Sequence, residues 1–139
     1  MALSTSSAPV HIAPPPVVQP LLDRVPALRL IGNTPLVRVT AFEDQHPGVE
    51  IHAKVEYFNP GGSLKDRPVL RMLSEAIADG RLVPGKTIID SSSGNAGIAY
   101  ALIGGALGFE VEIVIPDNAS KERLKRLAAH GAKITHTSA

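Results

Sequence analysis

Strand-like and helix-like patterns alternate through most of this chain, and that alternation limits the folds it can adopt. Alternating or continuous apolar residues predict strands at 51–58, 87–90, 111–115 and 133–137. Apolar residues at helical spacing lie between them, and short turns join the elements. This order is typical of a parallel sheet flanked by helices, so the predicted fold class is α/β.

A sheet of this kind gathers its ligand-binding loops at one edge. Right-handed crossovers bring the carboxyl ends of all its strands to the same side. Helix N-termini at that side attract anions. Two unusual loops, 59–66 and 91–97, fall on this edge. The sequence therefore predicts that a ligand site, if present, lies there.

The first loop, Asn59 to Arg67, places Lys65 in the first turn of the following predicted helix. Its two glycines allow close backbone approach to a ligand, and Ser63 can cap the helix. A cation at a helix N-terminus is locally unfavourable, so a functional reason for the lysine is plausible. The spacing fits a surface lysine at an ordinary loop-to-helix junction equally well.

The second loop runs from Ser91 to Gly97, follows an apolar strand and opens a small-residue helix. Hydroxyls, an amide and free backbone N–H groups converge there, a combination that suits a carboxylate or phosphate. A plain serine or asparagine cap, with glycine for tight helix-to-strand packing, explains the same residues. The loop alone does not decide between these readings.

Composition excludes several other classes of function. Fourteen Lys and Arg against thirteen Asp and Glu give a net charge of +1, and aromatics make up 4% of residues, so nucleic acid is not an expected partner. The chain has no cysteine, and its five histidines show no i, i+4 pair, so no metal site is expected. Without a long apolar run or a signal peptide, the expected location is the cytoplasm.

Three motifs, taken together, are more specific than any one of them. The loops Asn59–Arg67 and Ser91–Gly97 follow a third motif, Ile31–Val37, in the chain. In this order they closely resemble the cysteine synthase and cystathionine β-synthase family, which are fold-type-II pyridoxal-phosphate enzymes. The resemblance covers about 27–139. It implies the small domain of the tryptophan synthase β-like fold in incomplete form.

The resemblance also implies roles for individual residues. Lys65 matches the lysine that binds pyridoxal 5'-phosphate covalently and exchanges the substrate α-proton. Asn95 matches the asparagine that hydrogen-bonds the cofactor ring hydroxyl. The loop that grips the substrate carboxylate corresponds to Ser92, Ser93, Gly94, Asn95 and Ala96. Position 96 is often threonine in the family, so Ala96 lacks one side-chain contact, although its backbone N–H remains available.

A division of the chain follows from composition and resemblance together. Residues 1–20 are rich in Ser, Ala and Pro and are predicted to form a disordered tail. Residues 21–49 are expected to pack on the family's large domain. In its absence Leu28, Leu30 and Leu36 are expected to be exposed or to make contacts that the full protein does not make. Residues 50–139 are expected to form the small α/β domain with the lysine and the substrate loop.

The activity implied by the resemblance is synthesis of L-cysteine from O-acetylserine, or another activated serine, and a sulfur donor. Cystathionine β-synthase or serine/threonine dehydratase activity is the alternative, and a non-catalytic phosphometabolite-binding or partner-binding fragment is the alternative of another class. The family's phosphate-binding loop is not found before Ala139. This chain alone is therefore expected to be inactive, and the full-length enzyme is expected to be a homodimer.

Overall fold

The computed structural model describes residues 13–138. Residues 1–12 of the predicted disordered tail, which was expected over 1–20, lie outside this range. Within the range, Val18 is only 4% exposed and packs in the core, so ordered packing begins before residue 20. The elements in chain order are α1 (Gln19–Arg24), the 3-10 helix η1 (Pro26–Leu30), β1 (Leu36–Val39), β2 (Ile51–Lys54), the 3-10 helix η2 (Glu56–Phe58), α2 (Asp66–Ala78), β3 (Thr87–Ser91), α3 (Asn95–Ala106), β4 (Glu110–Pro116), α4 (Lys121–Ala129) and β5 (Lys133–Thr137).

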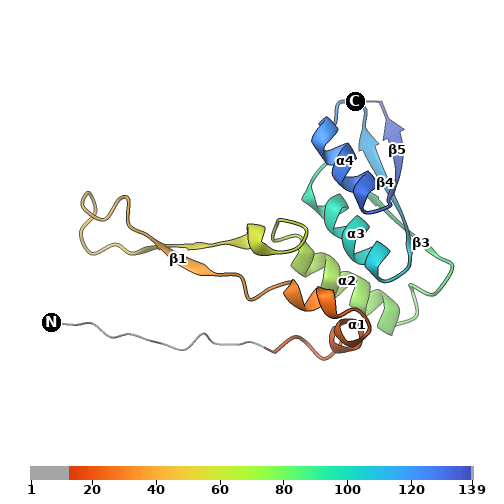
Figure 1. Ribbon diagram of the computed structural model, residues 1–139, viewed down its shortest axis with the longest axis horizontal. Helices are drawn as coiled ribbons and strands as arrows, with labels where there is room; N and C mark the ends of the chain where they lie inside the picture. Colours follow the sequence, from red (N-terminus) through yellow and green to blue (C-terminus); the bar gives the residue numbers. More distant parts are fainter. Residues whose placement is uncertain (1–12, 139) are drawn as a thin grey trace.

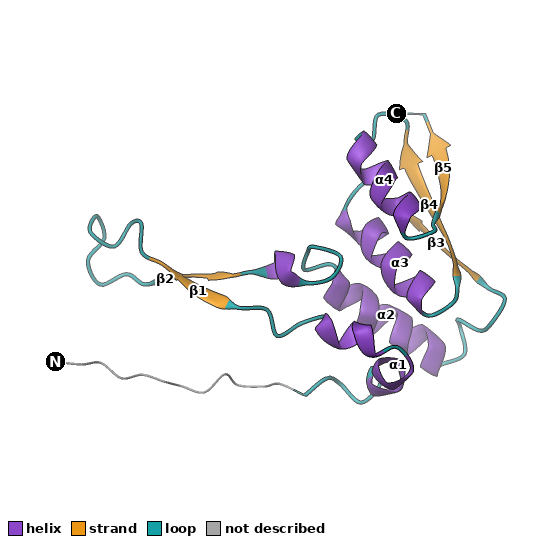
Figure 2. Ribbon diagram, viewed as in Figure 1, coloured by secondary structure: helices purple, strands orange, loops and turns teal. Residues whose placement is uncertain are grey.

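A three-stranded parallel sheet in the order β3-β4-β5 forms one layer of the fold. Its register pairs Ile88 with Val111 and Ile113 with Ile134. The strands follow one another in space as in sequence, so right-handed crossovers put α3 and α4 on the same face, as Figure 2 shows. The predicted α/β class, a parallel sheet flanked by helices, is confirmed.

Alternation within the strands separates the covered face of the sheet from the open one. Ile113 and Ile115 of β4 are at most 1% exposed, whereas Ile89 on β3 is 65% exposed. On the open face, the Glu112 carboxylate accepts hydrogen bonds from Lys133 at 2.9 Å and Thr135 at 2.6 Å. The helices therefore cover an apolar face and leave a mixed face uncovered.

The strand predicted at 51–58 does not belong to this sheet. Its observed part, β2, pairs antiparallel with β1, with Leu36 opposite Lys54 and Val39 opposite Ile51. All four β2 residues are exposed, and the two strands form a hairpin that extends away from the helices (Figure 1). A period of two indicates extended backbone and carries no information about the pairing partner. Among the described residues, the parallel sheet therefore has three strands rather than the four predicted.

Helix α2 packs beside α3 through one apolar face. Val69, Leu70 and Leu73 are buried there, whereas Met72 of the same helix is 45% exposed. Pro68 lies in the first turn, where its missing N–H removes no helical hydrogen bond. Past the C-terminal end, Gly80 adopts a φ of +76°, a conformation typical of helix termination.

The segment before the hairpin packs on the helical layer. Leu21 and Leu22 of α1 are buried, and Arg24 Nη2 donates a 2.8 Å hydrogen bond to the carbonyl of Leu107 at the end of α3. Leu28 is 2% exposed because η1 turns it into the same core, so of the two expected states it makes contacts rather than facing solvent. Leu30 and Leu36 are 67% and 64% exposed, as predicted.

Candidate functional site

Lys65 occupies the N-cap position of α2, immediately before the helix begins. Its side chain is exposed, and its amine has no hydrogen-bond partner among the described residues. The backbone N–H of Lys65 donates to Ser63 Oγ at 3.1 Å. The Ser63 hydroxyl thus fixes the turn before the helix, and the lysine amine remains free to react.

Asn59 organises the loop that carries Lys65. It is 3% exposed, and its Nδ2 donates to the carbonyl of Glu56 at 2.8 Å and to that of Ser63 at 3.0 Å. Its Oδ1 accepts from the backbone N–H of Gly32 at 2.9 Å. One buried amide therefore fastens the 31–37 motif to the lysine loop, although 27 positions separate Gly32 from Asn59.

Glu56 and Arg67 form an ion pair beneath the same loop. Arg67 Nε lies 2.8 Å from Oε2 of Glu56, and Thr34 Oγ1 donates to Oε1 at 2.7 Å. The hydrogen bond from Arg67, supported by those from Thr34 and Asn59, lowers the pKa of Glu56 to about 2 despite partial burial. Lys54 also contacts Thr34 and reinforces this cluster.

Asp66 is the first residue of α2 and is fully buried. Its Oδ2 accepts a 2.5 Å hydrogen bond from the backbone N–H of Gly61, and its Oδ1 has no partner among the described residues. Burial raises the pKa of Asp66, against the opposing effects of the Gly61 hydrogen bond and the Arg126 charge. Arg126 of α4 donates to the carbonyl of Gly61 at 2.9 Å.

Neither Asp66 nor Arg126 was among the predicted site residues. Asp66 follows the lysine directly, but its complete burial is not visible in the local sequence. Arg126 is 65 positions from Gly61, and it contacts the backbone rather than a complementary side chain. A side-chain contact to a distant carbonyl leaves no spacing pattern in a sequence.

The second loop begins where β3 ends. Ser92 Oγ accepts from the backbone N–H groups of Gly94 at 3.3 Å and Gly97 at 3.1 Å. The side chains of Ser93 and Asn95 are exposed, and Asn95 is the first residue of α3. Among the described residues, the N–H groups of Asn95 and Ala96 donate to no acceptor, so the start of α3 presents two free donors.

Gly97 brings α3 close to the sheet. A Cβ at this position would lie 3.2 Å from Cγ2 of Ile113 and 3.3 Å from the carbonyl oxygen of Ser92. Even alanine would require both neighbours to shift. The glycine predicted for tight helix-to-strand packing therefore has that role, and the packing fixes the orientation of the loop that precedes it.

The two loops lie at the same end of a helix pair. Helices α2 and α3 pack against each other and run in the same direction (Figure 1). Lys65 precedes the first helix and Asn95 begins the second. Among the described residues, no hydrogen bond joins the two side chains. An exposed amine and the free N–H groups of α3 are therefore available at one end of this helix pair.

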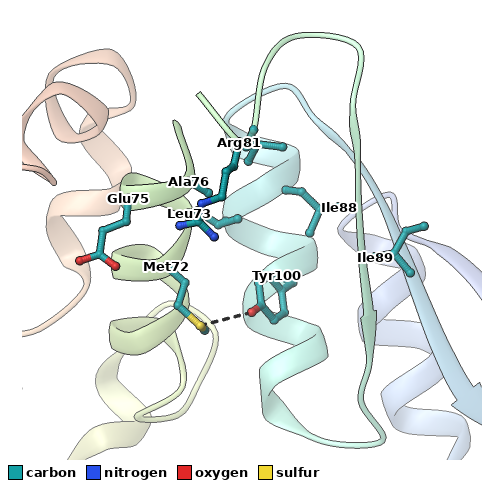
Figure 3. A pocket seen from close by; sticks show the side chains of 9 residues that line it. Met72, Leu73, Glu75, Ala76, Arg81, Ile88, Ile89 and Tyr100 are labelled. Atoms are coloured by element: carbon teal, nitrogen blue, oxygen red, sulfur yellow. Dashed lines mark hydrogen bonds between the residues drawn. The ribbon is translucent and has the colours of Figure 1, made fainter. Parts of the chain in front are cut away.

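A separate cavity of about 500 Å³ lies between α2, α3 and β3. Figure 3 shows Met72 and Tyr100 at this cavity, where Tyr100 Oη donates to Met72 Sδ at 3.6 Å. Leu73, Ile88 and Ile89 add apolar surface. No residue of the two loops lines this cavity, so it is not the predicted ligand site.

The comparisons with known proteins identify the class of enzyme. The family profile described as "Pyridoxal-phosphate dependent enzyme" matches residues 27–139. The chain belongs to this family, whose cofactor is pyridoxal 5'-phosphate.

No described helix has both the length and the apolar character needed to cross a membrane.

The similar proteins narrow the group within that family. The chain is 54% identical over 109 residues to a cysteine synthase of Aquifex aeolicus (strain VF5), and the matched region covers 77% of this chain and 33% of the relative. It is 46% identical over 112 residues to cystathionine beta-synthase of Mus musculus, covering 79% of this chain and 20% of the relative. The crystal structure of cysteine synthase from Entamoeba histolytica matches with a TM-score of 0.75 at 38% identity, covering 99% of this chain and 38% of that chain. The chain thus spans between a fifth and about two fifths of these proteins.

Proposed function

We propose that this chain supplies the cofactor lysine and the substrate-carboxylate loop of a pyridoxal-phosphate-dependent β-replacement enzyme. The observation that carries the proposal is the exposed Lys65 amine, which lies at the same end of the α2–α3 pair as the free N–H groups of Asn95 and Ala96. Family membership and relatives named cysteine synthase and cystathionine beta-synthase support it.

The residues at this end suit the cofactor and an amino-acid substrate. Lys65 would hold pyridoxal phosphate covalently, and Asn95 would hydrogen-bond its ring hydroxyl. When bound, the cofactor supplies an electron sink for the carbanion formed at the substrate α-carbon. The Lys65 amine would then accept the α-proton and later return one, a role that requires it to be neutral when it accepts.

The substrate carboxylate would bind at the start of α3. Donors there are the N–H groups of Asn95 and Ala96 and the exposed hydroxyl of Ser93, with the helix dipole favouring a negative charge. Ser92 has a different part in this proposal. Its hydroxyl already accepts from Gly94 and Gly97, so it shapes the loop that presents the donors.

The specific reaction we propose is the replacement of acetate in O-acetylserine by a sulfur nucleophile, which yields L-cysteine. The 54% identity to a cysteine synthase favours it. The similarity to cystathionine beta-synthase makes serine and a thiol amino acid the second candidate pair. The proposal includes a cytoplasmic homodimer, in which the hairpin of β1 and β2 packs on the large domain of the enzyme.

The exposed side chains of the hairpin support its proposed packing on the large domain. Leu36, Val37 and Phe42 are 49–64% exposed, and Tyr57 and Phe58 follow with ring centroids 5.0 Å apart. An isolated two-stranded hairpin is marginally stable in water, so a covering surface would stabilise it. The division of the chain at about residue 50 is part of the same proposal.

Reductive trapping tests the role of Lys65. The chain is incubated with pyridoxal phosphate, reduced with borohydride and digested, and the labelled lysines are located by mass spectrometry. Lys65 should carry most of the label, and Lys65→Ala should lose it together with any visible absorbance band. Lys121→Ala, at an exposed site in α4, is the matched control and should keep both. Label spread evenly over all lysines would refute the proposal.

A further inference from the structure

Both backbone polar groups of Gly61, its N–H and its carbonyl, are hydrogen-bonded by charged side chains. Its N–H donates to Asp66 Oδ2 at 2.5 Å, and its carbonyl accepts from Arg126 Nη2 at 2.9 Å. A Cβ on Gly61 would lie 2.2 Å from Asp66 Oδ1. A Cβ on Gly62, which adopts a φ of +75°, would lie 3.3 Å from Arg126 Nη2. Both side chains therefore pack directly on the loop backbone.

These two contacts connect the lysine loop to two different helices. Asp66 begins α2 and is fully buried, so its carboxylate is held by the packing around the start of that helix. Arg126 comes from α4, which packs on β5. The backbone of Gly61 is thus fixed between α2, which follows the lysine, and α4, which packs on the parallel sheet.

Lys65 has no comparable attachment of its own. Its amine makes no hydrogen bond to the described residues, and the backbone N–H bond to Ser63 is local. The position of the amine is therefore set by the backbone that carries it. Gly61 lies four residues before Lys65, and Asp66 directly follows it, so the two clamp contacts bracket the lysine in sequence.

We propose that Asp66 and Arg126 are positioning residues, which clamp the N–H and the carbonyl of Gly61 and so keep the Lys65 amine at the end of the α2–α3 pair where Asn95 lies. The inference rests on the proposed role of Lys65 and extends it to α4. Neither side chain donates to the amine. Both act through the loop backbone, and a change in α4 is therefore transmitted to the reactive nitrogen.

Amide hydrogen exchange tests the clamp in the 139-residue chain without any ligand. Arg126→Gln removes the charge-assisted hydrogen bond to the Gly61 carbonyl, so the loop should open more often. The N–H of Gly61, which donates to Asp66, should then exchange about tenfold faster or more. Arg126→Lys keeps the charge and should restore part of the protection. Arg123→Gln removes the same charge from an exposed position on the same helix and should leave exchange at Gly61 unchanged.

Lysine labelling gives the second readout. In the wild-type chain, pyridoxal phosphate and cyanoborohydride should modify Lys65 faster than Lys121 of the same molecule. Arg126→Gln should reduce this preference severalfold, whereas Arg123→Gln should retain it. Circular dichroism shows whether each variant is folded. If Arg126→Gln unfolds the chain, the comparison of Arg126→Lys with Arg123→Gln carries the test.

The outcomes separate the clamp from the function. Unchanged exchange at Gly61 in a folded Arg126→Gln variant would overturn the clamp. Faster exchange with an unchanged labelling preference would also overturn it, because the backbone would then not control the amine. A wild-type chain with no preference for Lys65 would refute the proposed function instead, and the exchange rates would still decide whether the clamp exists.

Discussion

Arg67 binds the carboxylate of Glu56 with two hydrogen bonds, one from Nε to Oε2 at 2.8 Å and one from Nη2 to Oε1 at 2.9 Å. This bidentate pair connects the first turn of α2 with the short helix η2 that follows the hairpin. Thr34 also donates to the same carboxylate, so a single side chain joins three segments. Bidentate geometry makes such a pair stronger than an ordinary surface ion pair.

The first prediction concerns the pH dependence that Glu56 imposes on stability. Its pKa falls from an ordinary 4.5 to about 2 in the folded chain. A carboxylate with a lowered pKa stabilises the fold above its unfolded pKa, and this is lost as pH falls from about 4.5 to about 2. Glu56→Gln should cost on the order of 1–2 kcal/mol at neutral pH, allowing for solvent screening of the partly exposed Arg67.

Denaturant unfolding at several pH values measures this effect. The difference between wild type and Glu56→Gln should shrink as the solution is acidified below about pH 4.5. Glu75→Gln is the control, since it breaks an exposed pair with Arg71 in α2 and should cost about 0.5 kcal/mol or less. A constant difference between wild type and Glu56→Gln at all pH values would contradict the assignment.

The second prediction is that Asp66 has the opposite effect. Its pKa is raised above the ordinary 3.8, chiefly by burial. The unfolded chain therefore gives up this proton at a lower pH than the folded chain does. The contribution of Asp66 to stability should decline as pH rises from 3.8 through the raised pKa. Asp66→Asn should abolish that decline. The double variant Glu56→Gln/Asp66→Asn should lack both of these pH-dependent contributions to the free energy of unfolding.

The third prediction separates two neighbouring serines. Ser92→Ala removes the acceptor for the N–H groups of Gly94 and Gly97 and should destabilise the ligand-free chain by about 1 kcal/mol, as loss of a helix cap does. Ser93→Ala should leave stability unchanged because its hydroxyl is exposed and makes no recorded contact. Under the proposed function, both variants should weaken substrate binding. Equal melting temperatures for the two variants would exclude the structural role of Ser92.

The fourth prediction concerns packing between α3 and the sheet. A Cβ on Gly104 would lie 2.6 Å from Cγ2 of Val111 and 2.9 Å from Cδ1 of Ile88. Gly104→Ala should therefore cost about 1–3 kcal/mol by overpacking, partly offset by a gain in helix propensity of about 1 kcal/mol. The cost should be smaller in a Val111→Ala background, where the nearest clash is absent. A more stable Gly104→Ala variant in the wild-type background would disprove this packing.

The sequence was sufficient to predict the elements whose side chains have a single covered face. Strand β4 was predicted at 111–115 and is observed at Glu110–Pro116, where Pro116 ends the apolar run. Helix α4 then begins after Ser120, which caps it by accepting from Arg123 N at 3.4 Å. The hairpin was missed because both of its strands are exposed and the choice of partner is not encoded in periodicity. The buried state of Leu28 depends on how η1 turns, which local propensity does not determine.

The candidate site was predicted in part for a similar reason. Loop motifs drew attention to Lys65 and Asn95 because unusual residues stand at helix starts. The groups that fix those loops, namely Asn59, Asp66 and Arg126, act through distant backbone atoms. Contacts of that kind arise only when the helices are packed, so residue spacing does not reveal them.

Strand β3 is an edge strand of the three-stranded sheet, and Ile89 beside that edge is 65% exposed. Along this edge, the described residues contribute no neighbouring strand. Open edges with apolar side chains recruit extended peptides from other molecules. The β3 edge is therefore the part of the described sheet where strand addition from another molecule meets the least obstruction.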